Sequence, residues 1–144
     1  MPRIFAAILL VCLLCVTAAP LVPASGTTMV ELAPARTRVG IARVNLAVSD
    51  LRLESSDTIV GVYEIKIPMA PWKNDRGEIS LHAPEPLEQL AADGGTLSGS
   101  GLSENDGRTH EIVCEFQADG FVEIHVISPD RELEFRTRYE LVNR

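Results

Sequence analysis

The sequence has few cysteines. Only three of its 144 residues are cysteine, and two of them, Cys12 and Cys15, lie in an apolar stretch at the start of the chain. Cys114 alone remains in the rest, which excludes a disulfide within one copy of that part. Small extracellular domains of animals are usually rich in disulfides. Because the chain also has no Asn-x-Ser/Thr site for glycosylation, these two absences favour a bacterial envelope compartment.

The first 24 residues have the three parts of a secretory signal. Arg3 supplies a positive charge, the 13-residue apolar run Ile4–Val16 follows, and small residues and prolines come next. This run is shorter than the roughly 20 residues that a membrane-spanning helix needs. We therefore expect export, to the periplasm or outside the cell, with cleavage after Ala24 or after Ala18. Retention of the segment as a membrane anchor is the alternative.

Removal of residues 1–24 leaves residues 25–144 as a single exported domain of ordinary length. The loss of Arg3 leaves 12 basic residues against 20 acidic residues, a formal charge of −8. The acidic residues are spread along the chain, and no cluster of basic residues stands out. Nucleic acid and anionic lipid surfaces are therefore not expected as partners, and a membrane is expected only if the N-terminal segment is retained.

Alternation of apolar and polar residues predicts strands over most of the chain. The expected strands are Met29–Leu32, Arg38–Val48, Ile59–Ile67, Ile79–Leu81, Thr109–Gln117, Phe121–Ile127 and Glu132–Leu141. A bulge or turn is expected near Ser49 and Asp50, where the apolar parity changes. Helical spacing predicts one short helix over Pro84–Asp93, with Gly94 ending it. The glycine-rich residues 94–103 are interpreted either as a distorted strand or as a mobile loop.

The last three strands have a register that the apolar pattern decides. A three-residue loop, Ala118–Gly120, pairs Phe116 with Val122 and places Gly120 in the left-handed conformation. A type I turn at Ser128–Arg131 then continues the same apolar face. The result is an antiparallel three-stranded meander. Together with the earlier strands it predicts an all-β fold, either an antiparallel β-sandwich or a small β-barrel, with one short helix.

The same register gathers charged residues on the opposite face of the meander. Glu123 is expected opposite Arg136, His125 opposite Glu134, and Glu115 beside Glu123. Such groups are able to build a metal or acid–base site, but a solvated face with paired charges is the commoner arrangement. Cys114 is expected to face the core, where a thiol is inert. The serine- and glycine-rich stretch fits neither a nucleophile elbow nor a dinucleotide fingerprint.

The loop between the strands at Ile59–Ile67 and Ile79–Leu81 contains the best candidate contacts. It holds Trp72, the only tryptophan of the chain, together with Lys73 and Arg76. An exposed tryptophan beside basic residues suits a protein hot spot or a platform for a sugar. The alternative is that Trp72 folds back and plugs one end of the domain.

These observations favour a non-enzymatic binding or accessory module in the cell envelope, with an envelope or extracellular protein or a glycan as partner. The first alternative is a β-barrel that carries a lipid-like or small apolar ligand. The second alternative is a hydrolase or metal enzyme that uses the charged sheet face. No cofactor, metal or catalytic residue is predicted, and Trp72, Lys73 and Arg76 are the expected contacts.

Overall fold

The structure is a computed structural model that describes residues 27–144, so the expected N-terminal signal lies outside the described residues. This part of the chain contains nine strands, one α-helix and one short 3-10 helix. In chain order the elements are β1 (Thr28–Leu32), β2 (Ala35–Val39), β3 (Ala42–Leu53), β4 (Thr58–Lys66), η1 (Pro71–Lys73), β5 (Asp75–His82), α1 (Leu87–Asp93), β6 (Gly95–Ser103), β7 (Thr109–Phe116), β8 (Phe121–Ser128) and β9 (Arg131–Asn143). Neither helix is long and apolar enough to cross a membrane.

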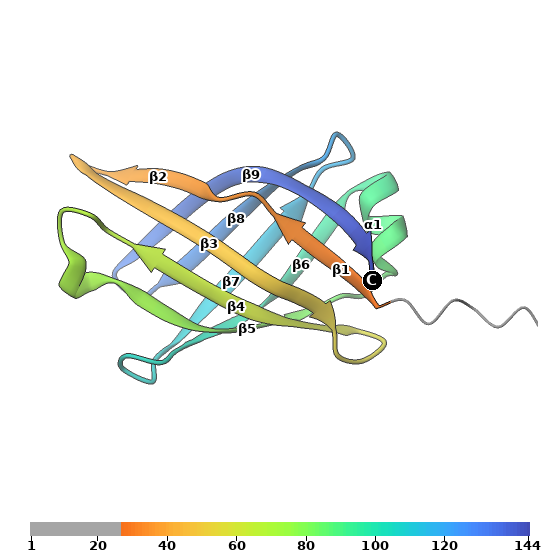
Figure 1. The fold of residues 1–144 in the computed structure, drawn as a ribbon, viewed down its shortest axis with the longest axis horizontal. Coiled ribbons are helices and arrows are strands. Elements are labelled where there is room, and N and C mark those ends of the chain that lie inside the picture. Colours follow the sequence, from red (N-terminus) through yellow and green to blue (C-terminus); the bar gives the residue numbers. More distant parts are fainter. Residues whose placement is uncertain (1–26) are drawn as a thin grey trace, which may run out of the picture.

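The strands form one antiparallel sheet that closes on itself (Figure 1). Strand β1 pairs with β9 along one side and with β3 along the other, where Met29 lies opposite Arg52. Strands β1 and β3–β9 therefore make a closed eight-stranded barrel, and β2 is an additional strand on β3. The fold is all-β, as the alternation predicts. Of the two expected architectures, the β-sandwich and the small β-barrel, the structure has the barrel. The sandwich is wrong, because closure joins the two edges that a sandwich leaves open.

Strands β1 and β2 lie end to end along β3. Met29 pairs with Arg52, and Ala35 pairs with Leu46 further along the same strand. Ala33 and Pro34 interrupt them, and the Thr137 hydroxyl donates a hydrogen bond of 2.8 Å to the Ala33 carbonyl. The Ala33 carbonyl therefore keeps a hydrogen-bond partner where the chain briefly leaves the barrel wall.

The expected strand over Arg38–Val48 is wrong. The structure ends β2 at Val39, turns at Gly40 and Ile41, and begins β3 at Ala42, which pairs with Val39. Gly40 has a φ of +60°, a conformation that glycine adopts without the steric cost of a side chain. Two signs of this turn are present in the sequence: the single glycine, and the change of apolar parity from Val39 and Ile41 to Val44 and Leu46.

The expected register of the C-terminal meander is confirmed. Phe116 pairs with Val122, Glu123 with Arg136 and His125 with Glu134, and Gly120 has a φ of +87°. The irregularity expected near Asp50 is also present, since the pairing of β3 with β4 shifts between Ser49 and Arg52.

The glycine-rich stretch is strand β6, not a loop. A Cβ atom on Gly99 would lie 1.9 Å from the Ser80 carbonyl oxygen, which belongs to the neighbouring strand β5. A Cβ atom on Gly101 would lie 2.8 Å from Ile112 Cδ1 and 3.0 Å from Tyr63 Cε1. Gly99 therefore lets β6 approach β5 closely, and Gly101 leaves space inside the barrel for the Tyr63 ring.

The two ends of the barrel differ. At one end α1 covers the interior with Leu87 and Leu90, which are both buried. Beneath it Phe116 and Tyr139 pack edge to face, with ring centroids 4.8 Å apart. The helix begins at Leu87 and not at Pro84, and Gly94 follows its end as expected. At the other end, on the left of Figure 1, lie the β2–β3 hairpin, the loop with η1, and the β6–β7 and β8–β9 turns. We call this second end the open end.

Cys114 lies inside the barrel, as its position in β7 predicts. Its side chain is 5 % exposed, and it is a free thiol. Burial raises the pKa of this thiol to about 12, because the apolar interior disfavours the charged thiolate.

Replacement of Gly99 by alanine should destabilise the barrel. The new Cβ atom meets the Ser80 carbonyl, so the strands must separate, and we expect a loss of at least about 2 kcal/mol in the free energy of unfolding. Urea unfolding measures this loss. Ser98→Ala, at an exposed position of the same strand, is the control and should change stability little. Equal stabilities of the two variants would contradict the close approach.

Cys114 should react very slowly in the folded protein, because thiolate is scarce well below its pKa and the side chain is buried. Alkylation with iodoacetamide at neutral pH, followed by mass spectrometry of the peptide that contains Cys114, measures the rate. The same peptide should be modified quickly after unfolding in urea. Rapid modification without denaturant would show that the thiol is accessible.

Candidate functional site

A cavity of about 530 Å³ occupies the interior at the open end of the barrel. Its inner wall is apolar and comes from strands β3, β4, β5, β7 and β8, whose inward-facing side chains line it. They include Leu46, Ile65, Ile79, Ile112, Ile124 and Val126. An eight-stranded barrel is just wide enough for side chains to fill it or for one small ligand to occupy it. In this barrel, side chains fill the end under α1 and leave the open end hollow.

A ring of polar side chains surrounds the mouth of this cavity, and we call this ring the rim. The residues that line the cavity and belong to the rim are Trp72, Lys73, Asn74, Asp75, Ser103, Asn105, Asp106, Arg108, His110, Ser128 and Arg131. They come from the loop with η1, the β6–β7 turn, the β8–β9 turn and the adjacent strand ends. An apolar interior with a polar entrance is the usual character of a site for a small molecule.

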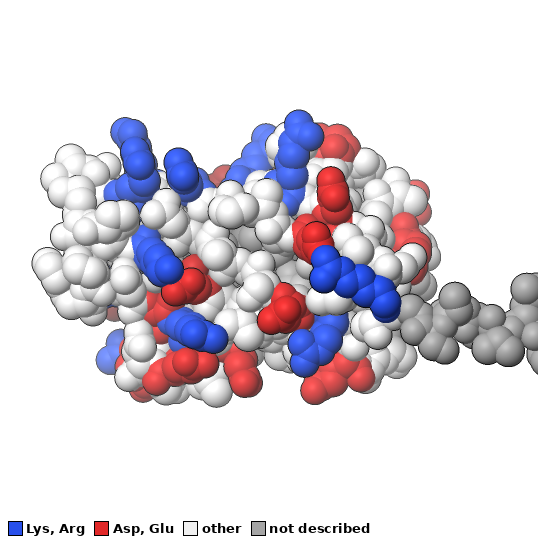
Figure 2. All heavy atoms as spheres, viewed as in Figure 1, with Lys and Arg blue, Asp and Glu red and all other residues white. Residues whose placement is uncertain are grey.

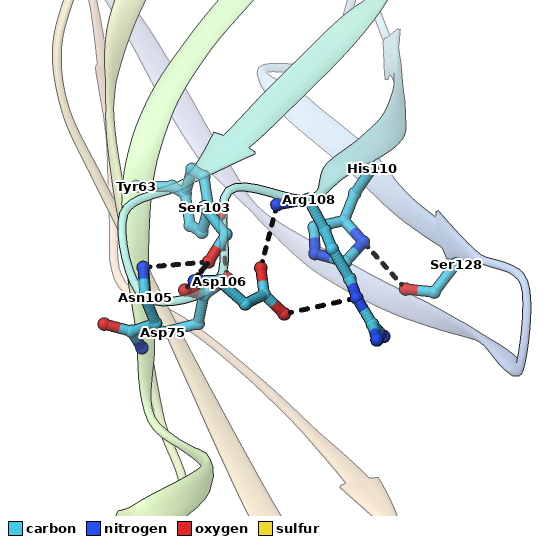
Figure 3. A network of polar contacts seen from close by, with 8 residues as sticks. All are labelled: Tyr63, Asp75, Ser103, Asn105, Asp106, Arg108, His110 and Ser128. Carbon is cyan, nitrogen blue, oxygen red and sulfur yellow. Dashed lines mark hydrogen bonds and ion pairs between the residues drawn. The ribbon is translucent and has the colours of Figure 1, made fainter.

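Asp75 organises one side of the rim (Figure 3). Its carboxylate accepts a hydrogen bond of 2.8 Å from the Tyr63 hydroxyl and one of 2.6 Å from the Ser103 hydroxyl. Its Oδ1 atom also accepts the Arg76 backbone N–H at 2.9 Å. Asp75 is thus tied to three strands, β4, β5 and β6, and this side of the rim is held rigidly in place.

The Tyr63 hydroxyl stays protonated at all ordinary pH values. Burial raises the pKa of Tyr63 far above its usual value of 10.0, and the hydrogen bond to Asp75 raises this pKa further. The phenol is therefore a fixed hydrogen-bond donor to Asp75, and it cannot serve as a base near neutral pH.

The β6–β7 turn is held by its own hydrogen bonds. The Ser103 Oγ atom accepts the backbone N–H groups of Asn105 at 3.2 Å and Asp106 at 3.4 Å. Asp106 in turn accepts the backbone N–H of Arg108 at 2.9 Å, and this bond lowers the pKa of the Asp106 carboxyl. The Arg108 side chain lies 3.7 Å from the same carboxylate. Asp106 is therefore ionised and already has a cationic partner.

A second polar pair lies beside this turn. Ser128 Oγ and His110 Nδ1 are 3.1 Å apart and join the ends of β8 and β7 (Figure 3). A serine next to a histidine is the start of a nucleophilic dyad, but such a base normally has a third group that orients it. Among the described residues no hydrogen bond to the other histidine nitrogen is found. The pair is able to donate to or accept from a bound molecule.

The structure separates the three predicted contacts. Trp72 and Lys73 lie in η1 at the rim, and the Trp72 side chain is 78 % exposed. Trp72 therefore does not plug the domain, as the alternative supposed. Arg76 lies in β5, where Asp75 and Gly77 face inward, so its exposed side chain projects from the outer wall away from the cavity. Whether any of the three binds a partner stays a prediction.

The charged outer face of the meander is present as the register implies. Ligand atoms of Glu115, Glu123 and His125 lie within 4.8 Å of one another. His125 Nδ1, however, lies 2.8 Å from Glu132 Oε1, and Arg136 Nη1 lies 4.0 Å from Glu123 Oε1. His125 thus pairs with Glu132 and not with Glu134, which is its backbone neighbour. The arrangement matches a sheet face with paired charges, and it lies outside the barrel, away from the cavity.

Most rim residues escape sequence analysis because they lie far apart in the chain. Asp75 begins β5, and Ser103 and His110 flank the turn between β6 and β7. Tyr63, which donates to Asp75 from inside the barrel, stands on β4. One signal was present: Ser103–Arg108 is a polar turn with the aspartate and glycine that turns favour. The alternation also indicated that Tyr63 and Ile65 share one apolar face. It could not indicate a cavity, because the cavity exists only once the sheet closes.

Tyr63→Phe should destabilise the protein by about 1–2 kcal/mol, because Asp75 loses one of its buried donors. The variant should also lose part of the alkaline sensitivity of the wild type. Because the folded pKa of Tyr63 lies above its unfolded value of 10.0, the neutral phenol stabilises the fold below pH 10.0, and this contribution falls as the pH rises further. Urea unfolding at neutral and alkaline pH measures both effects, and identical profiles for variant and wild type would contradict the network.

Comparisons with models of known protein families, with curated proteins and with solved structures gave no match to this chain.

Proposed function

We propose that the protein is an exported, non-enzymatic binding protein that holds one small amphipathic molecule inside the barrel. The observation that carries this proposal is the cavity of about 530 Å³ with an apolar wall and a polar rim. Pockets for small molecules commonly measure about 300–1,000 Å³. The proposal joins the predicted binding module with its first alternative, a barrel that carries an apolar ligand.

The wall of the cavity supports an apolar body for the ligand. Ile112, Ile124 and Val126 face the cavity from adjacent strands, and they offer no hydrogen-bonding side-chain atoms. Transfer of a hydrocarbon surface from water to this wall is favourable by about 25 cal/mol per Å². A polar molecule of the same size would lose its hydrogen bonds to water there without replacement.

The charges of the rim support an anionic end for the ligand. Asp75 is engaged by three hydrogen-bond donors, and Asp106 by Arg108. Lys73 and Arg131 also line the mouth, and in residues 27–144 neither has an acidic side chain within 4.0 Å. Two cations without a partner at the entrance favour a carboxylate, sulfonate or phosphate on the bound molecule.

Binding of a fluorescent probe tests the proposal. Anilinonaphthalene sulfonate has an apolar body and an anionic end, whereas phenylnaphthylamine has no charge. We expect both to bind and the anionic probe to bind more tightly, with this preference reduced in Arg131→Gln. Val126→Phe fills the cavity and should weaken the binding of both probes at least about tenfold, which corresponds to about 1.4 kcal/mol.

Ile127→Phe is the matched control, because Ile127 is the next residue of β8 and faces the outer wall. It adds the same side chain at a place where no cavity lies, and it should leave probe binding unchanged. Circular dichroism checks that both variants are folded. Equal probe affinities for Val126→Phe and Ile127→Phe would show that the probes bind elsewhere and would refute the proposal.

A further inference from the structure

The β2–β3 hairpin concentrates positive charge that the sequence as a whole does not suggest. Residues 33–48 contain Arg36, Arg38 and Arg43 and no acidic residue. Arg38 pairs with Arg43 across the hairpin, and Arg36 lies two residues away on the same face. All three side chains are exposed. In residues 27–144 no carboxylate lies within 4.0 Å of any of them.

Large apolar side chains are exposed at the same end of the molecule. Ile41 at the hairpin tip is 88 % exposed, and Met69 and Trp72 in the loop with η1 are 60 % and 78 % exposed. These three residues are among the five large apolar side chains of the described chain that are exposed. Single apolar residues scattered over a surface are ordinary. These three are instead gathered on two projections, the hairpin tip and the η1 loop.

The strand register places these two projections side by side. Strand β3 pairs with β4 as far as Asn45 and Lys66, and the loop with η1 begins directly after β4. Residues 42–44 of β3 continue beyond this point and pair only with β2. The hairpin tip therefore projects past the barrel wall next to the η1 loop. Figure 2 shows uncharged atoms gathered over this end, with Lys and Arg atoms along the adjoining surface.

We propose that the hairpin tip and the η1 loop dock onto the surface of a bilayer that contains anionic phospholipids. The apolar side chains would enter the interfacial layer, and the arginines would contact the headgroup phosphates. Tryptophan prefers this interfacial layer, and arginine matches the geometry of phosphate. Charge complementarity and protruding apolar tips together are the features of a protein that binds peripherally at a membrane.

The net negative charge of the chain does not oppose this docking. At physiological ionic strength charges are screened over about 8 Å, so a membrane responds to the groups that touch it. Of the acidic residues at this end, Asp75 accepts three hydrogen bonds and Asp106 pairs with Arg108. Glu104 and Asp130 lie in the β6–β7 and β8–β9 turns, outside the hairpin and the η1 loop. The barrel would therefore dock with one side of its mouth, and the cavity entrance would lie beside the lipid.

Trp72 is a built-in reporter for the test, because it is the only tryptophan in the chain. The full chain is mixed with vesicles of phosphatidylcholine alone or of equal parts phosphatidylcholine and phosphatidylglycerol. With the anionic vesicles we expect the Trp72 emission to shift to shorter wavelength and to resist quenching by acrylamide. With the neutral vesicles, or in high salt, we expect a much smaller change. Attachment through the apolar N-terminal segment alone would leave Trp72 in water.

Two variants and a matched control complete the experiment. The triple substitution Arg36→Gln, Arg38→Gln and Arg43→Gln should weaken binding to anionic vesicles at least about tenfold. Ile41→Ser should weaken binding to these vesicles as well. Because Ile41 is exposed at the hairpin tip, this substitution should leave the core intact. The control replaces Arg52, Arg136 and Arg138 by glutamine, which removes the same charge away from the open end and should leave binding unchanged.

An unchanged Trp72 emission with every vesicle would overturn the proposal. Equal losses of binding in the hairpin variant and the control variant would also overturn it, because they would trace the effect to net charge. Because Trp72 also lines the mouth of the cavity, the measurement is repeated with Val126→Phe, in which the cavity is filled. Docking predicts the same Trp72 shift in this variant, and loss of the shift would trace the signal to lipid inside the cavity and overturn the proposal.

Discussion

The pairing of β1 with both β9 and β3 is the constraint on which the rest of the structure depends. It joins eight antiparallel strands into a closed wall, and this wall has no free edge that would attract other chains. Closure also creates an inside. Once the sheet meets itself, the apolar face of every strand looks onto one shared interior, and the size of that interior follows from the number of strands and their tilt.

What fills the interior decides the proposed function. Under α1 the space is occupied by Phe116, Tyr139 and the two buried leucines of the helix. Toward the open end the wall carries shorter aliphatic side chains, while inward glycines let the strands bend, and a cavity of about 530 Å³ results. The network around Asp75 keeps this end in shape without filling it. The same end carries the exposed tips and arginines of the proposed membrane contact, so entry of a ligand and attachment to lipid would occur side by side.

The sequence predicted local structure better than global structure. Register in the meander followed from parity and from Gly120, because a slip of one residue would reverse every side chain. The hairpin at Gly40 was missed although the apolar parity changes there, from Val39 and Ile41 to Val44 and Leu46, because a single glycine does not by itself separate a turn from an irregular strand. The sequence could not decide between a sandwich and a barrel, because closure depends on the pairing of β1 with β3, which no local pattern predicts. For the same reason the rim and the arginine-rich hairpin face could not be assembled from the sequence, whereas Trp72 was recognised because it is unique.

The central claim is that the barrel is hollow at one end and that this hollow receives a small molecule. Methyl NMR spectroscopy with phenylnaphthylamine tests it most directly, because it locates the bound molecule. We expect shifts in the methyl signals of Ile112, Ile124 and Val126, which line the cavity, and little change at Leu87, which α1 places at the opposite, covered end. Shifts confined to outward-facing methyl groups such as Ile127, or shifts centred on Leu87, would contradict it.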